Sequence, residues 1–389
     1  MTNTSIYQDI ATRTEGSLFL GVLGPVRTGK STFIKRFMET QVIPNIDNVY
    51  RRERAIDELP QSGSGKTVMT AEPKFVPEEA VEVSLGDGAT VSVRLIDSVG
   101  YMVKGAMGQF EDGQPRMVMT PWFDEEIPMA EAAEIGTRKV ITEHSTIGIV
   151  VTTDGSITDI DREDYIEPED RVIQELKELG KPFIVLLNSE EPTSQRAQSI
   201  SQEISKKHGV ACIPINCLTL NEQDIKNILQ AVLFEFPLCE LDFYLPSWVD
   251  ALQMDHPIKS DIYTRLREAT AHLGHVRQVR SAMEEIGNAD EIKDARITGI
   301  DLGKGLAGVE LELPRQLFYD TISAQSGFTI ADDGDLMSLL TELASVKSAY
   351  DKVASALESV HETGYGIVMP GMDELILQEP EIMKQGGRY

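Results

Sequence analysis

The sequence is poor in cysteine, in positive charge and in long apolar runs, and each shortage excludes a class of protein. Three cysteines among 389 residues, without Cys or Cys/His metal spacing, exclude a disulfide framework and a structural zinc site. The 36 basic residues face 63 acidic ones, and a net charge of −27 argues against nucleic-acid binding and electrostatic attachment to anionic lipid. No apolar run approaches the roughly 20 residues of a membrane-spanning helix, and no signal peptide is recognisable. We therefore expect a soluble, cytosolic protein with reduced thiols.

The chain divides into segments of different composition. A hydrophobic share of 41% and a charged share of 25% are ordinary for a globular protein, and the length predicts two or three domains. We expect a polar lead-in at 1–17, a first domain at 18–236, a second domain at 237–366, and a further segment at 367–389.

Strand and helix patterns alternate along the first domain. Mostly apolar or alternating runs predict strands, and amphipathic stretches with three- and four-residue spacing predict helices. The predicted strands are 18–23, 81–85, 90–96, 147–153, 182–187 and 210–215, and the predicted helices are 31–40, 128–144, 168–179, 195–207 and 222–234. The two strands around Gly86-Asp-Gly88 predict a hairpin. Alternation of this kind predicts an α/β domain with a mostly parallel sheet.

The pattern changes after residue 237. Apolar residues predict two long helices, 258–286 and 336–360, and two strands between them, 295–302 and 306–313. This predicts a smaller α+β domain with long helices. Packing of these helices within the domain is the default expectation, and packing on a partner chain is the alternative.

One glycine-rich segment fits the pattern of a phosphate-binding loop. Gly24-Pro-Val-Arg-Thr-Gly-Lys-Ser31 follows the predicted strand at 18–23 and precedes an amphipathic helix. Glycines let successive backbone N–H groups face one anion, and the helix N-terminus adds its dipole. Lys30 is expected to bind the β- and γ-phosphates, and Ser31 to offer its hydroxyl to Mg²⁺. This segment predicts a P-loop NTPase domain.

A carboxylate at the end of a second strand completes the predicted site. In Arg94-Leu-Ile-Asp-Ser-Val-Gly100, Asp97 can hold Mg²⁺ through water, and the Gly100 N–H can meet the γ-phosphate. Nucleotide switches use a threonine between these two motifs, and we select Thr70, with a solvated loop threonine as the alternative. The expected catalytic residues are Lys30, Thr70 and Asp97, and the expected metal-binding residues are Ser31, Thr70 and Asp97. The expected nucleotide-binding residues are Gly24, Pro25, Val26, Arg27, Thr28, Gly29, Lys30, Ser31, Thr32, Gly100 and Asn188.

The segments that would read the base and activate water depart from the usual patterns. Asn188-Ser-Glu-Glu191 stands where a guanine-reading N-K-x-D is expected, which makes guanine selectivity doubtful and adenine a serious candidate. Tyr101 replaces the usual water-orienting Gln, and a phenol beside the γ-phosphate predicts slow hydrolysis or completion by another group. Four charged residues are candidates, by position alone, for the group that completes hydrolysis: Arg27, Arg138, Lys139 and His144. A surface or helix-end role is the alternative for each.

Several long strings in the chain are specific enough to indicate a family. Among them are Glu72-Pro-Lys-Phe-Val-Pro77, Glu131-Ala-Ala-Glu-Ile-Gly-Thr-Arg-Lys-Val140 and Leu245-Pro-Ser-Trp248. Others are residues 21–37, 57–61, 65–67, 97–101, 121–122, 143–148, 152–155, 363–366 and 379–382. Over nearly its whole length the chain resembles the stage IV sporulation protein A family of spore-coat morphogenetic ATPases.

The resemblance implies properties that the motifs alone do not show. The family is related to translation-factor-type GTPases but uses ATP with Mg²⁺. Hydrolysis drives it into static homopolymers that form the basement layer of the spore coat. A small amphipathic membrane-bound sporulation peptide recruits it, and other coat proteins are further partners. The implied location is the mother-cell cytoplasm at the forespore surface.

Residue roles also follow from the resemblance. Lys30 resembles the Walker-A lysine, Asp97 the Walker-B aspartate and Thr70 the sensor threonine. The family carries a second threonine where this chain has Ala71, so Thr70 would serve alone. The family continues into a further C-terminal region, which implies that a chain ending at Tyr389 is truncated.

Three functions are compatible with these observations. The first is an ATP-hydrolysing, self-assembling morphogenetic protein. The second is a regulatory GTPase switch of the translation-factor type. The third is a scaffold that binds nucleotide without turning it over.

Overall fold

The structure, a computed structural model, describes residues 6–60, 72–85, 89–106, 110–111, 114–120, 122–287, 291–369 and 376. The chain forms two compact units, Met1–Glu312 and Leu313–Tyr389. The first unit contains the sheet that carries the phosphate loop, and the second contains a short helix followed by a long one.

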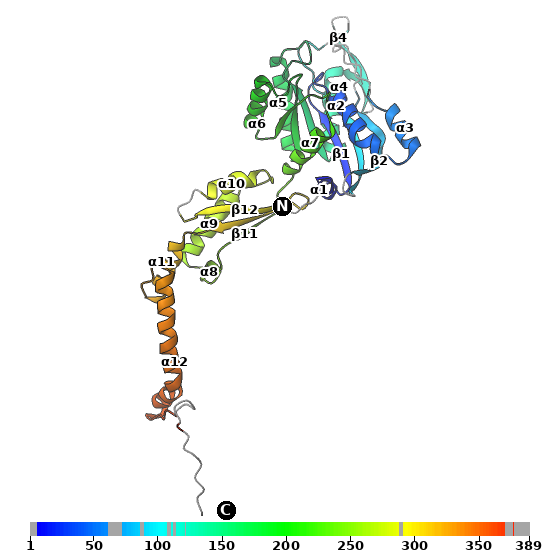
Figure 1. Cartoon of the computed structure of the whole chain (residues 1–389). Helices are drawn as coiled ribbons and strands as arrows, with labels where there is room; N and C mark the ends of the chain where they lie inside the picture. The colour runs from blue at the N-terminus through cyan, green and yellow to red at the C-terminus, as the bar shows by residue number, and fades with distance from the viewer. Residues whose placement is uncertain are drawn as a thin grey trace, which may run out of the picture. The chain divides into compact units, whose positions relative to one another are not determined.

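A six-stranded sheet forms the centre of the first unit (Figure 1). Its order is β10-β9-β8-β1-β3-β2; the first five strands run parallel to one another, and β2 pairs antiparallel with β3 at the edge. The strands are β1 (Ser17–Leu23), β2 (Lys74–Leu85), β3 (Ala89–Asp97), β8 (Ile147–Thr153), β9 (Phe183–Asn188) and β10 (Cys212–Ile215). The predicted α/β class and the predicted hairpin are therefore confirmed.

Helices cover both faces of this sheet. Three helices bury Ile10, Phe33 and Leu229 in one apolar cluster on the first face. These helices are α1 (Ile6–Arg13), α2 (Lys30–Phe37) and α7 (Glu222–Phe234). The second face buries Ile141 and Leu176 beneath α5 (Glu163–Glu178), α6 (Gln195–His208) and the π-helical turn η4 (Val140–His144), which continues α4 (Met129–Lys139). In such a three-layer arrangement, ligands bind at the carboxyl ends of the parallel strands.

Some elements of the first domain lie where the sequence shows no periodicity. The lead-in contains α1, whose eight residues are too few to repeat a helical pattern clearly. Residues 41–80, where the sequence predicts no helix or strand, contain α3 (Val49–Asp57) and the start of β2. The described part of residues 101–128 contains four short strands. These are β4 (Phe110–Glu111), β5 (Gln114–Pro115), β6 (Met117–Thr120) and β7 (Phe123–Pro128).

A second sheet follows in the same unit, with the order β11-β13-β12. Strands β12 (Asp294–Asp301) and β13 (Leu306–Glu312) form the predicted antiparallel pair, and β11 (Glu240–Tyr244) is an additional strand parallel to β13. The prediction of one continuous helix at 258–286 is wrong. That segment is α9 (Pro257–Thr270) and α10 (Gln278–Ile286), after the single turn α8 (Ser247–Asp250). The Gln278 side chain, at the start of α10, holds the turn between the two helices by accepting from the backbone N–H of Gly274 and of His275.

The second unit consists of α11 (Arg315–Ser326) and α12 (Asp333–Thr363). The Asp332 side chain caps the start of α12 by accepting from two backbone N–H groups, and Gly364, with φ of 80°, ends it. The Tyr319 hydroxyl donates to Asp333 at 2.6 Å and joins the two helices. The helix predicted at 336–360 is confirmed. Among the described residues, no helix is both long enough and apolar enough to span a membrane.

Candidate functional site

The predicted phosphate loop connects β1 to α2 at the carboxyl edge of the parallel sheet. Its backbone has positive φ at Gly24 (127°), Arg27 (68°) and Gly29 (98°), so the chain curls sharply between the strand and the helix. The Val26 N–H donates to the Tyr101 carbonyl at 2.9 Å, which joins the loop to the segment that follows β3. A curl of this kind lets backbone N–H groups converge on an anion.

Two of these positions admit only glycine because other chain segments lie against them. A Cβ atom at Gly24 would lie 2.2 Å from the Val151 carbonyl oxygen of β8. A Cβ atom at Gly29 would lie 2.3 Å from Nδ2 of Asn188, which ends β9. The packing of the loop on its neighbours therefore requires the glycines that the motif contains.

Lys30 begins α2 and is 6% exposed. Its Nζ donates to the carbonyl oxygens of Pro25, at 2.7 Å, and Gly24, at 3.3 Å. Burial lowers the pKa of Lys30 to about 8, although the nearby carboxylate of Asp97 acts in the opposite direction. A buried ammonium group bonded to carbonyl oxygens of its own loop can exchange them for the stronger charge-assisted bonds of a phosphate.

Ser31 and Asp97 form a hard-oxygen pair beside the loop. The Ser31 hydroxyl donates to Oδ2 of Asp97 at 2.5 Å, whereas Oδ1 is buried without a hydrogen-bond partner among the described residues. Burial raises the pKa of Asp97, and the bond from Ser31 and the charge of Lys30 oppose this shift. Mg²⁺ prefers oxygen ligands and few protein groups, so a hydroxyl next to an unsatisfied carboxylate oxygen fits the ion.

Gly100 lies against Lys30, since a Cβ atom there would be 2.6 Å from the lysine Nζ. The Gly100 N–H donates to the Thr137 hydroxyl at 3.3 Å, and that hydroxyl donates to the Ala133 carbonyl within α4. A γ-phosphate that binds the Gly100 N–H would therefore replace Thr137. Sequence reasoning missed Thr137, because only the packing of α4 on the loop reveals its role.

The side chain of Tyr101 points away from the loop. Its hydroxyl donates to Glu175 on α5, its ring lies 5.0 Å from the Arg171 guanidinium carbon, and it is 2% exposed. Burial and then Glu175 raise the pKa of Tyr101. The expectation of a phenol beside the γ-phosphate is therefore wrong. The residue meets the loop through its backbone carbonyl, and its side chain packs under α5.

The side chain of Asn188 joins the phosphate loop to the segment that follows β10. Its Nδ2 donates to the Thr28 carbonyl at 3.0 Å, and its Oδ1 accepts from the Cys217 N–H at 3.0 Å. Ser189, at the position of the missing base-packing lysine, is buried, and Glu191 is exposed. The structure thus gives Asn188 a supporting contact with the loop.

The remaining candidates lie in different settings. Thr70 falls within 61–71, outside the described residues, so its predicted role stays a prediction. Arg138 is exposed on α4, and Lys139 pairs with Glu143 at 3.1 Å. The His144 ring packs edge-on against Phe75. Among the four charged candidates for completing hydrolysis, Arg27 is the one within the loop itself, and Thr32 lies half-buried in the first turns of α2.

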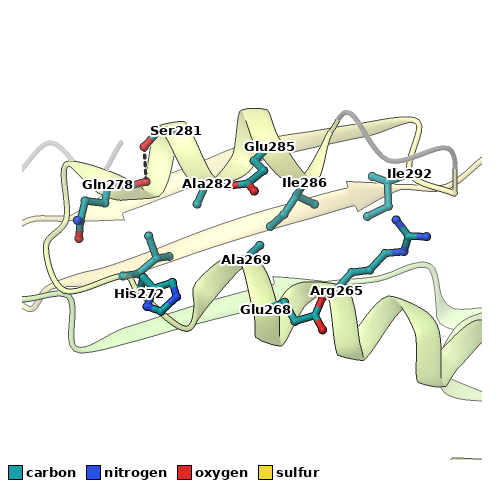
Figure 2. Close-up of a pocket in the computed structure, with 11 residues that line it drawn as sticks. Arg265, Glu268, Ala269, His272, Gln278, Ser281, Ala282, Glu285, Ile286 and Ile292 are labelled. Carbon is teal, nitrogen blue, oxygen red and sulfur yellow. Dashed lines mark hydrogen bonds between the residues drawn. The ribbon is translucent and has the colours of Figure 1, made fainter.

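A separate pocket of about 470 Å³ lies between α9 and α10 (Figure 2). Ala269 and Leu273 line it from α9 and the turn that follows, and Ala282 and Ile286 line it from α10. Arg265, at its rim, bonds to Glu291. This pocket does not include the phosphate loop, and its lining offers no nucleophile paired with a base, so we assign no chemistry to it.

Known proteins match the chain over its whole length. The family model for stage IV sporulation protein A, ATPase domain, matches residues 1–237, and the model for its middle domain matches residues 238–389. Stage IV sporulation protein A of Clostridioides difficile (strain 630) is 49% identical over 387 residues, which cover 100% of this chain and 79% of that protein. The proteins of the same name from Bacillus subtilis (strain 168) and Bacillus anthracis are 46% and 45% identical over 389 residues, with the same coverage.

Proposed function

This chain belongs to the stage IV sporulation protein A family, and on that premise we propose that it hydrolyses ATP with Mg²⁺ and assembles into a static homopolymer. It is a protein of a sporulation family with an ATPase domain. The finer proposal is that the polymer forms the basement layer of the spore coat. The use of ATP and not GTP is supported by residues 188–191, in which Ser189 and Glu191 replace the lysine and the aspartate of the guanine-reading N-K-x-D pattern.

One observation carries the enzymatic part of the proposal. Lys30, Ser31, Asp97 and Gly100 come from two separate motifs, yet they lie together at the loop, where the lysine is buried and the aspartate is half-buried. The ammonium group of Lys30 bonds to neutral carbonyl oxygens, and one oxygen of Asp97 lacks a hydrogen-bond partner among the described residues. Their arrangement suits a polyphosphate with a bound cation.

The proposed mechanism is in-line attack of water on the γ-phosphate. Lys30 binds the β- and γ-phosphates, the Gly100 N–H leaves Thr137 for the γ-phosphate, and Thr70 closes over it. Ser31 and Asp97 would hold Mg²⁺, which supplies charge neutralisation when bound. Tyr101 takes no part in orienting water, because its hydroxyl is bonded to Glu175.

Phosphate release from ATP and from GTP, measured side by side, tests this proposal. We expect ATP turnover that falls roughly 100-fold or more in Lys30→Ala and in Asp97→Asn, because each removes transition-state charge stabilisation. Lys35→Ala is the matched control, since Lys35 lies on the same helix and its ammonium group is 3.9 Å from the carboxylate of Glu39, away from the loop. Polymers that pellet with ATP but not with a non-hydrolysable analogue would support hydrolysis-driven assembly.

Two other functions are distinguished by the same measurement. Preferred turnover of GTP would favour the regulatory GTPase switch. Binding of nucleotide without turnover of ATP or GTP would favour the scaffold. The observation that supports a scaffold is the bond of the Tyr101 hydroxyl to Glu175, which keeps this side chain from orienting water.

The proposed partners follow from family membership. They are further copies of the chain, a small amphipathic membrane-bound sporulation peptide and other coat proteins. The proposed location is the mother-cell cytoplasm at the forespore surface. Capture of the peptide by the purified chain, and its loss with a scrambled peptide, would test the recruitment step.

A further inference from the structure

The long helix α12 carries an apolar seam with a strict seven-residue repeat. Spacings of three and four residues alternate without interruption for eight positions. The seam consists of Leu336, Leu339, Leu343, Val346, Tyr350, Val353, Leu357 and Val360. On a straight helix such a repeat drifts by about 20° per heptad, and supercoiling around a partner helix removes the drift. The period therefore indicates a coiled coil and not a helix packed on a globular core.

The middle of this seam is exposed. Val346 is 57% exposed, Tyr350 55% and Leu343 40%, which is unusual for apolar residues on one helix face. The far end is partly covered within the chain, because Gly366 lies against the Ala356 carbonyl and Val360. The exposed turns thus form a continuous apolar face in the part of the second unit that the structure describes.

One pair of charges beside the seam favours another copy of the same helix as the partner. In heptad notation, Leu343 occupies position a and Val346 position d, which puts Glu342 at g and Lys347 at the following e. In a parallel, in-register coiled coil, position g of one chain faces position e of the next heptad on its neighbour. Glu342 of each copy would then face Lys347 of another. Both side chains are exposed and can turn toward a neighbour, and Lys347 bonds to Asp351 on its own helix at 3.4 Å.

The seam residues also bear on the number of chains. Leucine stands at position a at three of four places, and β-branched valine at position d at three of four. Leucine at a with a β-branched residue at d favours more than two strands. The flanking positions include Ala349, Ala354 and Ala356, which widen the apolar face as a bundle of several helices requires.

We propose that α12 binds α12 of further copies of this chain in a parallel, in-register coiled coil of three or four strands. The inference deepens the proposed self-assembly, on which its biological setting rests. The contact itself needs no nucleotide, so it can be tested apart from ATP hydrolysis.

The test is analytical ultracentrifugation of the full chain without nucleotide. We expect a concentration-dependent species of three or four times 43.1 kDa. Val346→Glu should weaken association at least tenfold, whereas Met337→Glu should leave it unchanged. The two residues form a matched pair, because both are apolar residues of α12 with exposures of 57% and 64%, but Met337 lies off the seam. Since both are exposed, neither change threatens folding.

Charge exchange tests the orientation. Glu342→Lys should weaken a parallel assembly, because two ammonium groups would then face each other across each contact, and adding Lys347→Glu should restore the unlike pair. In an antiparallel arrangement, position g faces position g and position e faces position e, so Glu342 would not face Lys347 and adding Lys347→Glu would restore nothing. That result would overturn the parallel assignment.

Several outcomes would overturn the inference. They are a monomer at every concentration, equal loss in Val346→Glu and Met337→Glu, and a monomer that instead captures an amphipathic peptide on α12. A two-chain species would support the contact but overturn the strand number. Phosphate release separates this inference from the proposed function. Val346→Glu that hydrolyses ATP but fails to associate supports both, whereas a chain that associates without hydrolysing contradicts only the ATPase proposal.

Discussion

At the scale of single residues, the three cysteines differ in their surroundings, and their reactivity should differ accordingly. Burial raises the pKa of Cys212 and of Cys217 to about 12, whereas Cys239 is exposed. At pH 8 a thiol with a pKa of about 12 is a thiolate in roughly one molecule in 10,000, and the thiolate is the reactive form. We expect iodoacetamide at pH 8 to modify the native chain once, on Cys239, as measured by intact mass spectrometry.

The control for this labelling is Cys239→Ser, which should remain unmodified until denaturant is added. Rapid modification of native Cys217 would contradict the burial of its thiol. Its Sγ would lie 3.8 Å from a Cβ atom at Gly29, so its reaction would indicate that the phosphate loop opens. Cys217 labelling is therefore also a probe of loop opening.

A second prediction concerns Tyr101. Tyr101→Phe removes the hydrogen bond to Glu175 but leaves the backbone contact with Val26, so ATP turnover should stay within about twofold of the original chain. The free energy of unfolding should fall by about 1–3 kcal/mol, because Glu175 loses a partner in a part-buried setting. Phosphate release and urea denaturation measure the two effects. A tenfold loss of turnover with unchanged nucleotide affinity would instead place the phenol in the reaction.

The residues of the candidate site differ in how far the sequence predicts them. Lys30, Ser31, Asp97 and Gly100 follow from spacing, because a phosphate loop and the end of the neighbouring strand are built by local backbone and sheet pairing. Thr137 comes from a helix whose register against the loop depends on tertiary packing, so no local pattern reveals it. The same applies to Glu175, the hydrogen-bond partner of Tyr101.

At the scale of elements, α1 fastens the second sheet to the first domain. Arg13 Nε donates to the Leu302 carbonyl at 2.6 Å, and its Nη2 donates to the Pro237 carbonyl at 3.1 Å. The guanidinium also lies 5.4 Å from the Phe236 ring centroid. The side chain thus joins the lead-in helix, the end of the ATPase domain and the turn between β12 and β13.

Arg13→Gln should loosen this junction. Hydrogen bonds from a charged group contribute about 1.5–3 kcal/mol each to the free energy of unfolding. Without them, the first domain and the second sheet should unfold less cooperatively. Trp122 and Trp248 lie on either side of the junction in the sequence, and single-tryptophan variants allow each side to be followed in urea. The two transitions should coincide in the parent chain and separate in Arg13→Gln.

The matched control is Arg51→Gln, because Arg51 is exposed on α3, away from the junction. Coincident transitions in Arg13→Gln would mean that other contacts hold the second sheet. The bond from Arg277 to Glu235, at 2.8 Å, is the next contact to remove in that case.

Elements were predictable where local signals were strong. Helix α7 begins and ends as expected because Asn221 and Asp224 form a capping box before an amphipathic stretch. Helix α1 and strand β11 are too short to show a period, and each is stabilised by contacts far away in the sequence. At the break between α9 and α10, the Gln278 side chain accepts from two backbone N–H groups of the connecting turn, and apolar spacing does not reveal such a contact.

At the scale of the whole molecule, net charge opposes association between copies. The chain carries −27, and α12 itself has an excess of acidic residues. They are Asp333, Asp335, Glu342, Asp351, Glu358 and Glu362, against Lys347 and Lys352. Parallel copies in register would bring these acidic side chains together along the assembly. The free energy gained by burying apolar surface along the seam must therefore exceed the free energy of this repulsion, which acts over about a Debye length.

Salt should consequently strengthen the association of the full chain. Raising NaCl from about 20 to about 200 mM shortens the Debye length from about 20 Å to about 7 Å. This screens the repulsion between distant like charges more than the attraction within a contact pair, such as Glu342 of one copy and Lys347 of its neighbour. We expect the midpoint concentration for association, measured by analytical ultracentrifugation, to fall severalfold over this range. The double variant Glu342→Lys with Lys347→Glu has the same net charge and should show the same dependence. Association that weakens with salt would mean that attraction between unlike charges, and not the apolar seam, holds the copies together.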